Sequence, residues 1–477
     1  MVVFIVGAGP GDLGLVTLKA KELIERAEVL LYDKLANPVM LEWAPPGCTI
    51  IYVGKRESGS DSSQKIQSDI NSLLVKYGRD KFVVRLKGGD PYIFGRGGEE
   101  AQICVQEGIP FETVPGISSC YAVPAYAGVP VSHRDFNSSF AVLTGHEQDK
   151  EQSTIDWVHL PETVVVLMGV SQIRMTATRL LEAGRDPTTP VAAIRAGTRP
   201  EQTTRMTTLR ELADQGIDLK PPVIFVIGPA AKLHSELDWF GKKLELARGK
   251  RVVLTRAKGH EKESTEIMET FGFDTVSMPL IEIVDREFEV PDLQQYDALV
   301  LTSLEGVKRV AAKADLGTFP GLVFPIGPKT RHYLLDRWPG LKVSMGDTYN
   351  SRGLGEHILS RLPKGGRILG LRSSAASGEL EALLEGSYSY SEIPIYDIQQ
   401  VPADPKKLDG ADAVFVVSAS CALSISELDP SVFEGKTVVS IGPMTSNHLT
   451  IDHITARTHT INGMVDAYMN YLWTGYP

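Results

Sequence analysis

Short runs of apolar, largely β-branched residues alternate with helical patterns along the first half of the chain. Strands that alternate with helices form α/β domains, in which helices cover a largely parallel sheet. The pattern therefore predicts an α/β fold with a largely parallel sheet. The apolar runs occupy residues 2–6, 29–32, 82–86, 140–143, 164–167 and 223–227, and an amphipathic helical pattern occupies residues 17–27.

The length of the chain predicts more than one domain. At 477 residues it is longer than a single hydrophobic core usually grows, so we expect about two or three domains. The charged segment GKKLELARGK follows the last apolar run of the first half. We place the domain boundary in this segment, which predicts one domain at residues 1–240, a linker at 241–249 and a second domain at 250–477.

The second half contains an internal repeat. YDALVLTS at residues 296–303 resembles ADAVFVVS at 411–418, and FPIGPKT at 324–330 resembles VSIGPMT at 439–445. Both motifs recur at one spacing of 115 positions, as from Ser303 to Ser418. A constant spacing over two motifs predicts a duplicated βα lobe. One pair of repeats is too few for a solenoid, so we expect two similar α/β lobes that face a cleft.

Charge and composition exclude several classes of protein. A formal net charge of −10 argues against a nucleic-acid binder, and it means that an anionic substrate needs a local cluster of cations. The first apolar run begins at Val2, which leaves no room for an export signal, and no run reaches membrane-spanning length. The cysteines have no metal-ligand or CxxC spacing, which predicts reduced thiols, no metal site and a cytoplasmic protein. They are Cys48, Cys104, Cys120 and Cys421.

Two glycine-rich loops follow predicted strands. The first, GAGPGD at residues 7–12, would suit a dinucleotide, but its sixth position is Asp12, whose carboxylate would repel a pyrophosphate. The second, RLKGGDPYIFGRGGEE at residues 85–100, has adjacent glycines against which a flat ligand can lie. Its Asp90 can accept hydrogen bonds or oppose a sulfonium cation. A tight structural turn for the first loop and a long capped turn for the second remain open.

Both loops, with VPGISSCYAVPAYAGVPVSHRD at residues 114–135, resemble the uroporphyrinogen-III C-methyltransferases of the tetrapyrrole methylase family over residues 1–240. The resemblance implies two α/β lobes around a cleft, S-adenosyl-L-methionine as the methyl donor, and a homodimer as the usual state. It implies transfer of two methyl groups to C2 and C7 of uroporphyrinogen III, giving precorrin-2. The cofactor contacts that it implies are Pro10, Gly88, Gly89, Asp90, Ile93, Ser118, Ser119, Met168 and Ala196. Relatives often have Thr-Ala in place of the two serines, and a serine hydroxyl can replace that of threonine.

The same resemblance implies an acid/base pair at Asp33 and Lys55, which follow the second and third predicted strands. Open α/β sheets bind ligands at that edge, although a turn residue and an exposed surface lysine are the default roles. Methylating a pyrrole carbon creates a cation that must lose a proton, and Asp33 could stabilise this cation or accept the proton. The acetate and propionate groups of the substrate would be bound by Arg56, Arg96, His133 and Arg134, although His133 alone would suit a structural role.

From Gly249 onward the chain resembles uroporphyrinogen-III synthase, through KRVVLTRA at residues 250–257, PLIEI at 279–283 and the two IGPxT turns. The resemblance implies two lobes joined by connecting strands, lobe one from about 250–283 and 397–477 and lobe two from about 287–392. It implies closure of hydroxymethylbilane to uroporphyrinogen III with inversion of the last ring, without a cofactor. Tyr396 would assist the loss of hydroxide, with an ordinary strand aromatic as the alternative, and the expected substrate-binding residues are Ser303, Thr330, Thr445 and Ser446.

Two other functions remain open. A nicotinamide or flavin oxidoreductase would need an acidic residue about 20 positions after the first glycine loop, where Asp33 roughly lies, but Asp12 counts against it. The second half could be a ligand-binding module without catalysis. No unassigned segment is long enough for a precorrin-2 dehydrogenase module of the kind that some related fusions carry.

Overall fold

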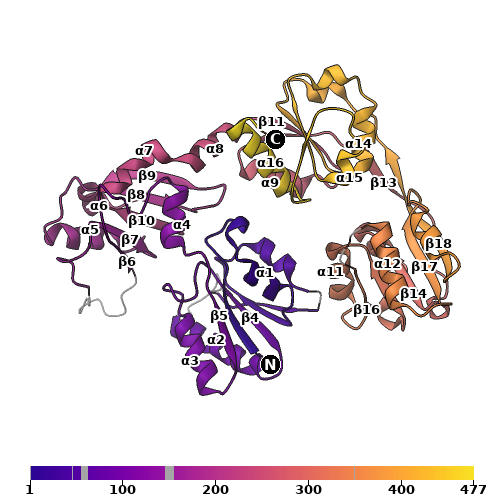
Figure 1. The fold of residues 1–477 in the computed structure, drawn as a ribbon, viewed down its shortest axis with the longest axis horizontal. Helices are drawn as coiled ribbons and strands as arrows, with labels where there is room; N and C mark the ends of the chain where they lie inside the picture. The colour runs from indigo at the N-terminus through magenta and orange to yellow at the C-terminus, as the bar shows by residue number, and fades with distance from the viewer. Residues whose placement is uncertain are drawn as a thin grey trace. The chain divides into compact units, whose positions relative to one another are not determined.

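The computed structural model describes residues 2–45, 47–54, 63–145, 155–346, 348 and 350–476. The chain divides into two compact units, Met1–Arg248 with Thr270–Gly272, and Gly249–Glu269 with Phe273–Pro477. Four β-sheets with flanking helices lie in the described part of the chain, which confirms the predicted α/β class (Figure 1). None of the helices described is long and apolar enough to cross a membrane.

The first sheet of the first unit is parallel throughout, as predicted. Its strand order is β3 (Thr49–Tyr52), β2 (Val29–Tyr32), β4 (Phe82–Lys87), β1 (Val2–Gly7) and β5 (Phe111–Val114). Helix α1 (Leu18–Ile24) covers one face, and α2 (Ser63–Gly78) and α3 (Gly97–Gln106) cover the other (Figure 1). Successive side chains of β1 alternate between these two cores: Phe4 and Val6 pack on the α1 side, and Val3 and Ile5 on the other. Burial on both faces explains the nearly continuous apolar runs.

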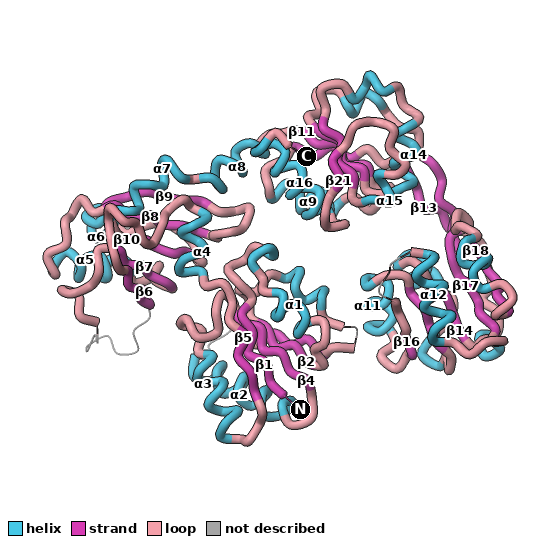
Figure 2. The backbone as a smooth tube through the Cα atoms, in the orientation of Figure 1, coloured by secondary structure: helices cyan, strands magenta, loops and turns pink. Residues whose placement is uncertain are grey.

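The second sheet of the first unit is mixed, so the expectation of a largely parallel sheet is wrong here. Its order is β6 (Phe140–Thr144), β7 (Thr163–Leu167), β10 (Val223–Ile227), β8 (Pro190–Arg195) and β9 (Thr203–Thr208). β6 and β7 are parallel, whereas β10 is antiparallel to both neighbours and β8 is antiparallel to β9. The loop between β8 and β9 is too short for the crossover that a parallel pair requires. Helices α5 (Ile173–Glu182) and α6 (Leu209–Gln215) cover one face and α4 (Ser119–Tyr126) covers the other (Figure 2).

The segment expected to be a linker is largely helical. Helix α8 spans Trp239–Ala247, and the Asp238 side chain caps it by accepting a hydrogen bond from the Gly241 amide at 3.0 Å. The Trp239 ring packs edge-on against Tyr126 of α4, with centroids 4.9 Å apart. Leu244 and Ala247 are buried whereas Lys242 and Glu245 are exposed, so the helix is amphipathic. The domain limits of residues 240 and 250 stay a prediction.

The second unit contains a five-stranded and a six-stranded sheet. The five-stranded sheet has the order β12 (Asp274–Ser277), β11 (Arg251–Thr255), β19 (Ala413–Val416), β20 (Thr437–Ser440) and β21 (Ile454–Thr455). The six-stranded sheet has the order β13 (Ile281–Asp285), β18 (Ser389–Gln400), β17 (Arg367–Ser373), β14 (Ala298–Leu301), β15 (Leu322–Pro325) and β16 (Lys342–Val343). The helices are α9 (Lys262–Thr270), α10 (Leu304–Ala311), α11 (Pro328–Arg337), α12 (Ser351–Arg361), α13 (Glu379–Leu384), α14 (Ala419–Ser426), α15 (Pro443–Ser446) and α16 (Ile461–Thr474).

Strands β13 and β18 extend across the expected lobe limits, which stay a prediction. Residues 281–283 and 397–400 were expected in lobe one, but β13 and β18 pair antiparallel from Ile281–Gln400 to Asp285–Tyr396 within the six-stranded sheet. β18 also pairs with β17, so both strands belong to the six-stranded sheet, while the Ile281 carbonyl also accepts a hydrogen bond from the Lys258 amide at 2.9 Å. The chain thus passes between the two sheets through this antiparallel pair.

The internal repeat corresponds to equivalent elements of the two sheets. The order β14, α10, β15, α11, β16 recurs as β19, α14, β20, α15, β21. Ser303 and Ser418 each follow the first strand of their repeat and cap the next helix, accepting hydrogen bonds from the amides of Gly306 at 3.0 Å and Cys421 at 3.2 Å. Gly327 and Gly442 occupy the same position before α11 and α15. These correspondences support the duplication, which stays a prediction.

We expect residues 1–248 and residues 249–477 to fold when they are expressed separately, because each part contains complete sheets with their own buried cores. Each should show an α/β circular dichroism spectrum and a cooperative unfolding transition. A cut after Gly216 is the control, since it removes β10 from between β7 and β8 and should leave the first fragment unfolded or aggregated. Aggregation of both halves would contradict the division.

Candidate functional site

A cavity of about 680 Å³ lies in the first unit, at the carboxyl ends of β1, β2 and β4. The carboxyl ends of β7 and β8 and the start of α4 also contribute residues to its lining. Ligands of open α/β sheets bind at this edge, and the volume is in the range of small-molecule sites.

Nine of the predicted site residues, widely separated in the sequence, meet in the lining of this cavity. They come from the loops after β1, β2, β4, β7 and β8 and from the first turn of α4. They are Pro10, Asp33, Gly88, Gly89, Ile93, Arg96, Ser119, Met168 and Ala196.

The other predicted residues of the first half do not line the cavity or are not described. The Asp90 carboxylate accepts hydrogen bonds from the amides of Tyr92 at 2.8 Å and Gly116 at 3.1 Å, so it holds the glycine-rich loop in shape. Ser118 is buried and caps α4. His133 and Arg134 lie in the loop after α4 and do not line the cavity. Lys55 and Arg56 lie outside the described residues.

The two glycine-rich loops are hydrogen-bonded to each other. The amide of Gly89 donates to the carbonyl of Gly9 at 2.8 Å, and the amide of Gly9 donates to Gly89 at 3.2 Å. Gly89 has a φ of 67°, and a Cβ on Gly88 would lie 2.5 Å from the Cβ of Leu35. Backbone contact therefore accounts for these glycines without a pyrophosphate. Asp12 accepts hydrogen bonds from the Gly14 amide at 2.7 Å and the Tyr126 hydroxyl at 2.6 Å, which is a structural role.

Non-glycine residues with a positive φ gather at this cavity. Phe94, Arg96, Met168 and Ala196 line it with φ between 48° and 60°, and Thr198 at 66° follows the lining residue Gly197. Such a conformation costs roughly 1–3 kcal/mol per residue and persists mainly at functional sites. Sequence reasoning missed this feature, because none of these residue types specifies a left-handed backbone.

The lining is strongly basic although the chain is acidic. Among its described residues it contains four cations and the single carboxylate of Asp33. A cationic wall in a protein of net charge −10 attracts an anionic ligand to this place in particular. The four cations are Arg85, Lys87, Arg96 and Arg199.

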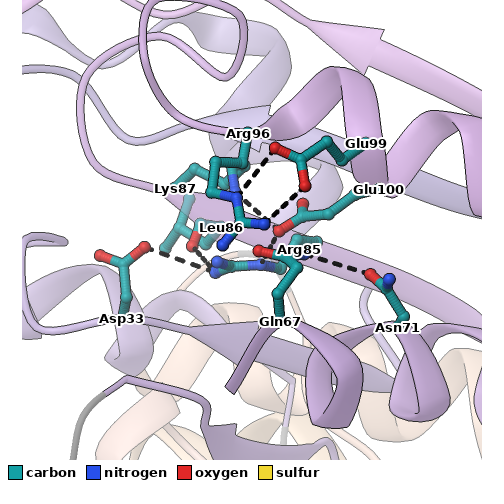
Figure 3. A network of polar contacts seen from close by, with 9 residues as sticks. All are labelled: Asp33, Gln67, Asn71, Arg85, Leu86, Lys87, Arg96, Glu99 and Glu100. Carbon is teal, nitrogen blue, oxygen red and sulfur yellow. Dashed lines mark hydrogen bonds and ion pairs between the residues drawn. The ribbon is translucent and has the colours of Figure 1, made fainter. Parts of the chain in front are cut away.

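Three charged residues that contact one another at the cavity wall (Figure 3) are almost completely buried. Arg85 is 3%, Lys87 4% and Glu100 0% exposed. The Lys87 ammonium donates to Glu100 Oε1 at 2.7 Å, and the Arg85 guanidinium reaches both Glu100, at 3.3 Å, and Asp33, at 3.5 Å. Burial lowers the pKa of Lys87, and Glu100 opposes this shift. Sequence reasoning gave these three residues no role; the available signal was two cations inside the otherwise apolar strand FVVRLK.

In the second unit, the structure brings Ser303 and Tyr396 together, with their hydroxyl oxygens 2.8 Å apart. Tyr396 is buried, and the Arg309 guanidinium lies over its ring at 5.3 Å. Thr330 and Thr445 are buried at the third positions of α11 and α15. The Ser446 hydroxyl lies at the edge of the five-stranded sheet, 2.5 Å from the Ser440 hydroxyl and 2.8 Å from that of Thr455.

Comparisons with known proteins agree with this division. Residues 2–213 match the family Tetrapyrrole (Corrin/Porphyrin) Methylases, and residues 262–466 match Uroporphyrinogen-III synthase HemD. The Porphyrin biosynthesis protein HemD of Ruminiclostridium josui is 29% identical over 97% of both chains. The S-adenosyl-L-methionine-dependent uroporphyrinogen III methyltransferase of Methanosarcina barkeri is 47% identical over 49% of this chain and 94% of its own length. The solved uroporphyrin-III C-methyl transferase of Thermus thermophilus, complexed with S-adenyl homocysteine, is 35% identical over 49% of this chain and 100% of its own, with a TM-score of 0.42.

The loop after β8 approaches α4 so closely that Gly197→Ala should destabilise the first unit. The added Cβ would overlap both methyl carbons of Val123, so we expect the free energy of unfolding to fall by about 1–3 kcal/mol in urea titrations. Val123→Ala in the same chain should recover part of this loss, because it removes the two closest contacts but leaves the Cβ of residue 123, which is 2.8 Å from the added atom. Gly98→Ala is the control, since its Cβ meets nothing within 4 Å and α3 should gain up to about 1 kcal/mol. Unchanged stability of Gly197→Ala would contradict the close approach.

Proposed function

Because the chain belongs to the tetrapyrrole methylases over its first half and to the uroporphyrinogen-III synthase HemD family over its second, we propose that it catalyses two successive steps of tetrapyrrole biosynthesis. The second unit closes hydroxymethylbilane to uroporphyrinogen III with inversion of the last ring. The first unit methylates this product at C2 and C7 with S-adenosyl-L-methionine, giving precorrin-2. The observation that carries the methylation is the cavity with four cations and one carboxylate, because the substrate is a polycarboxylate.

The residues of the cavity fit S-adenosyl-L-methionine. Gly88 and Gly89 form a wall of exposed backbone, and Ser119 at the start of α4 offers an amide and a hydroxyl to a polar group. Ile93 and Met168 add apolar surface for an adenosine moiety. When it is bound, the cofactor supplies an electrophilic methyl group. The relative from Methanosarcina barkeri is named as dependent on this cofactor, which supports the same assignment here.

Asp33 is the carboxylate that we assign to the methylation chemistry. Attachment of a methyl group to a pyrrole carbon leaves a positive charge on the macrocycle, which is removed when a proton leaves. Asp33 can stabilise that charge and accept the proton. Its Oδ1 accepts a hydrogen bond from the Leu35 amide at 3.1 Å, and its Oδ2 faces Arg85, so its orientation is fixed from within the protein. The role proposed for Lys55 as its partner stays a prediction.

In the second unit, we assign the hydroxyl pair of Tyr396 and Ser303 to the departure of hydroxide. The carbon–oxygen bond of the hydroxymethyl group breaks, and a hydrogen bond from a phenol stabilises the leaving oxygen. The amides at the starts of α10 and α11, after β14 and β15, are suited to carboxylates of the bilane. Thr330, Thr445 and Ser446 stay predicted contacts of the same substrate.

Asp33→Asn should separate methylation chemistry from cofactor binding, because it keeps the shape of the side chain but removes its charge and basicity. We expect the kcat for methylation of supplied uroporphyrinogen III to fall by roughly 10²–10⁴-fold. The affinity for S-adenosylhomocysteine, measured by calorimetry, should stay unchanged. Asp80→Asn, an exposed aspartate in the turn before β4, is the control and should behave like the parent. If Asp33→Asn methylated at the rate of the parent chain, Asp33 would have only a structural role.

The fusion of two activities can be tested in a single reaction. The intact chain, given hydroxymethylbilane and S-adenosylmethionine, should form the dimethylated product without another enzyme. Tyr396→Phe should slow ring closure on the order of tenfold, because it removes one hydrogen bond to the leaving group, and the non-enzymatic type I isomer should accumulate. Methylation of supplied uroporphyrinogen III should not change.

Chromatography of the porphyrin isomers measures this result. Tyr476→Phe, at a tyrosine that is 77% exposed, is the control and should give the type III product at the parental rate. Formation of only the type I isomer by the parent chain would exclude the synthase activity and leave the methyltransferase untouched.

A further inference from the structure

Four charged side chains from three segments meet in one network (Figure 3), and three of them line the cavity. Strand β4 supplies Arg85 and Lys87, which are two positions apart and so lie on the same face of the sheet. Helix α3 covers this face and supplies Glu100, and the end of β2 supplies Asp33. Two cations and two anions are thus brought together by the parallel pairing of β2 with β4 and by the packing of α3.

Glu100 is the centre of this network, but it does not reach the cavity. Its Oε1 accepts hydrogen bonds from Lys87 Nζ at 2.7 Å and Arg85 Nε at 3.3 Å. Its Oε2 is buried and has no hydrogen-bond partner among the described residues. Arg85, Lys87 and Asp33 line the cavity, whereas Glu100 does not. Glu100 can therefore act on a ligand only through the cations that it holds.

Arg85 contacts both Glu100 and Asp33, so the position of Asp33 depends on how Glu100 holds Arg85. The Nε of Arg85 is held by Glu100, and its Nη1 donates to the Leu86 carbonyl at 2.8 Å and to Asp33 Oδ2 at 3.5 Å. A guanidinium is planar, so contacts at two of its nitrogens fix the plane of the whole group. Without Glu100, a buried cation would lose its anchor and turn toward the remaining carboxylate of Asp33.

We propose that Glu100 is a positioning residue for methylation, which fixes the Asp33 carboxylate through Arg85 and holds the Lys87 ammonium as a second cation at the cavity wall. This inference rests on the proposed function, in which Asp33 meets the positive charge of the methylated ring. A buried ion network that only stabilises the fold would need no cavity-lining members. Here three of its four members line the cavity.

The protonation state of Lys87 distinguishes a positioning role of Glu100 from a purely structural one. Burial lowers the pKa of Lys87, as does the charge of Arg85, whereas Glu100 and Asp33 oppose the shift. Glu99 of α3 also faces this cluster and is paired with Arg96. Removing the charge of Glu100 removes an effect that raises the pKa, so Lys87 loses its proton at a lower pH. Lys87 is cationic below its pKa, and activity that needs this cation will therefore decline at lower pH in Glu100→Gln than in the parent.

The experiment measures the kcat and KM of the full-length chain for methylation of uroporphyrinogen III from neutral to alkaline pH. We expect Glu100→Gln to reduce kcat on the order of tenfold to a hundredfold through misplacement of Asp33, with S-adenosylhomocysteine affinity unchanged. The decline of kcat at alkaline pH should occur at a lower pH in Glu100→Gln than in the parent chain. Adding Lys87→Met should abolish this shifted decline and leave kcat low. Glu107→Gln is the matched control, since Glu107 follows α3, is exposed and pairs with Arg79 at 2.8 Å.

The activity of the parent chain tests the proposed function, and the behaviour of Glu100→Gln tests the inference about Glu100. A parent chain that does not methylate uroporphyrinogen III would contradict the proposed function, whatever the variants do. With an active parent, a folded Glu100→Gln with parental kcat would overturn the inference. So would a reduced kcat with an unshifted pH profile, because a purely structural role predicts that outcome.

If Glu100→Gln alone does not fold, the double variant carries the test. It removes both charges of the Lys87–Glu100 pair, which a protein tolerates better than one unpaired buried charge, and leaves Arg85 beside Asp33. Folding is checked by calorimetric binding of S-adenosylhomocysteine. In this double variant, a low kcat without the alkaline decline supports the inference, and parental kcat overturns it.

Discussion

The close approach of three backbone segments at the carboxyl edge of the first sheet determines how the rest of the methylation site is arranged. A Cβ on Gly7 would lie 2.5 Å from the Cα of Gly116, and a Cβ on Gly116 would overlap the carbonyl oxygen of Gly89. Only glycine permits this contact, and the paired hydrogen bonds between Gly9 and Gly89 depend on it. The Asp90 carboxylate completes the junction by binding the Gly116 amide. The glycine-rich wall and the ends of β1, β4 and β5 are thereby held together beside the cavity.

The charge of the cavity lining in the first unit is opposite in sign to the net charge of the chain. The protein carries a net charge of −10, yet the described lining of its cavity contains four cations and one carboxylate. Two of these cations, Arg85 and Lys87, are almost completely buried, and they are retained because Glu100 compensates them from behind the wall. An anionic tetrapyrrole would thus meet positive charge whose position is set by the interior of the protein rather than by mobile surface side chains.

The two units share an α/β architecture, but the groups that we assign to catalysis differ in kind between them. The cavity that we assign to methylation is lined by charged side chains and strained backbone, whereas the groups of the second unit that we assign to catalysis are the neutral hydroxyls of Ser303 and Tyr396. Loss of hydroxide from hydroxymethylbilane needs hydrogen bonding to a leaving group, which such hydroxyls supply without a cofactor. Under the proposed function, the product of the second unit is the substrate of the first, so a single chain would keep both enzymes at equal concentration.

The sequence by itself determined the α/β class, the strands with nearly continuous apolar runs and the glycine-rich loops, because local burial patterns and turn chemistry are properties of neighbouring residues. The nine predicted residues that line the cavity came from the resemblance of the sequence motifs to a known family. Tertiary structure alone decided the insertion of β10 between β7 and β8, which makes the second sheet mixed. It also decided that Asp90 holds a loop and Ser118 caps α4 while Asp33 lines the cavity, and that residues 241–247 continue a helix packed on α4. The meeting of Arg85 and Lys87 with Glu100, which lies behind the cavity wall, likewise came from the tertiary structure. Each of these outcomes depends on partners far away in the chain, and the choice of such a partner is a matter of packing that no local pattern contains.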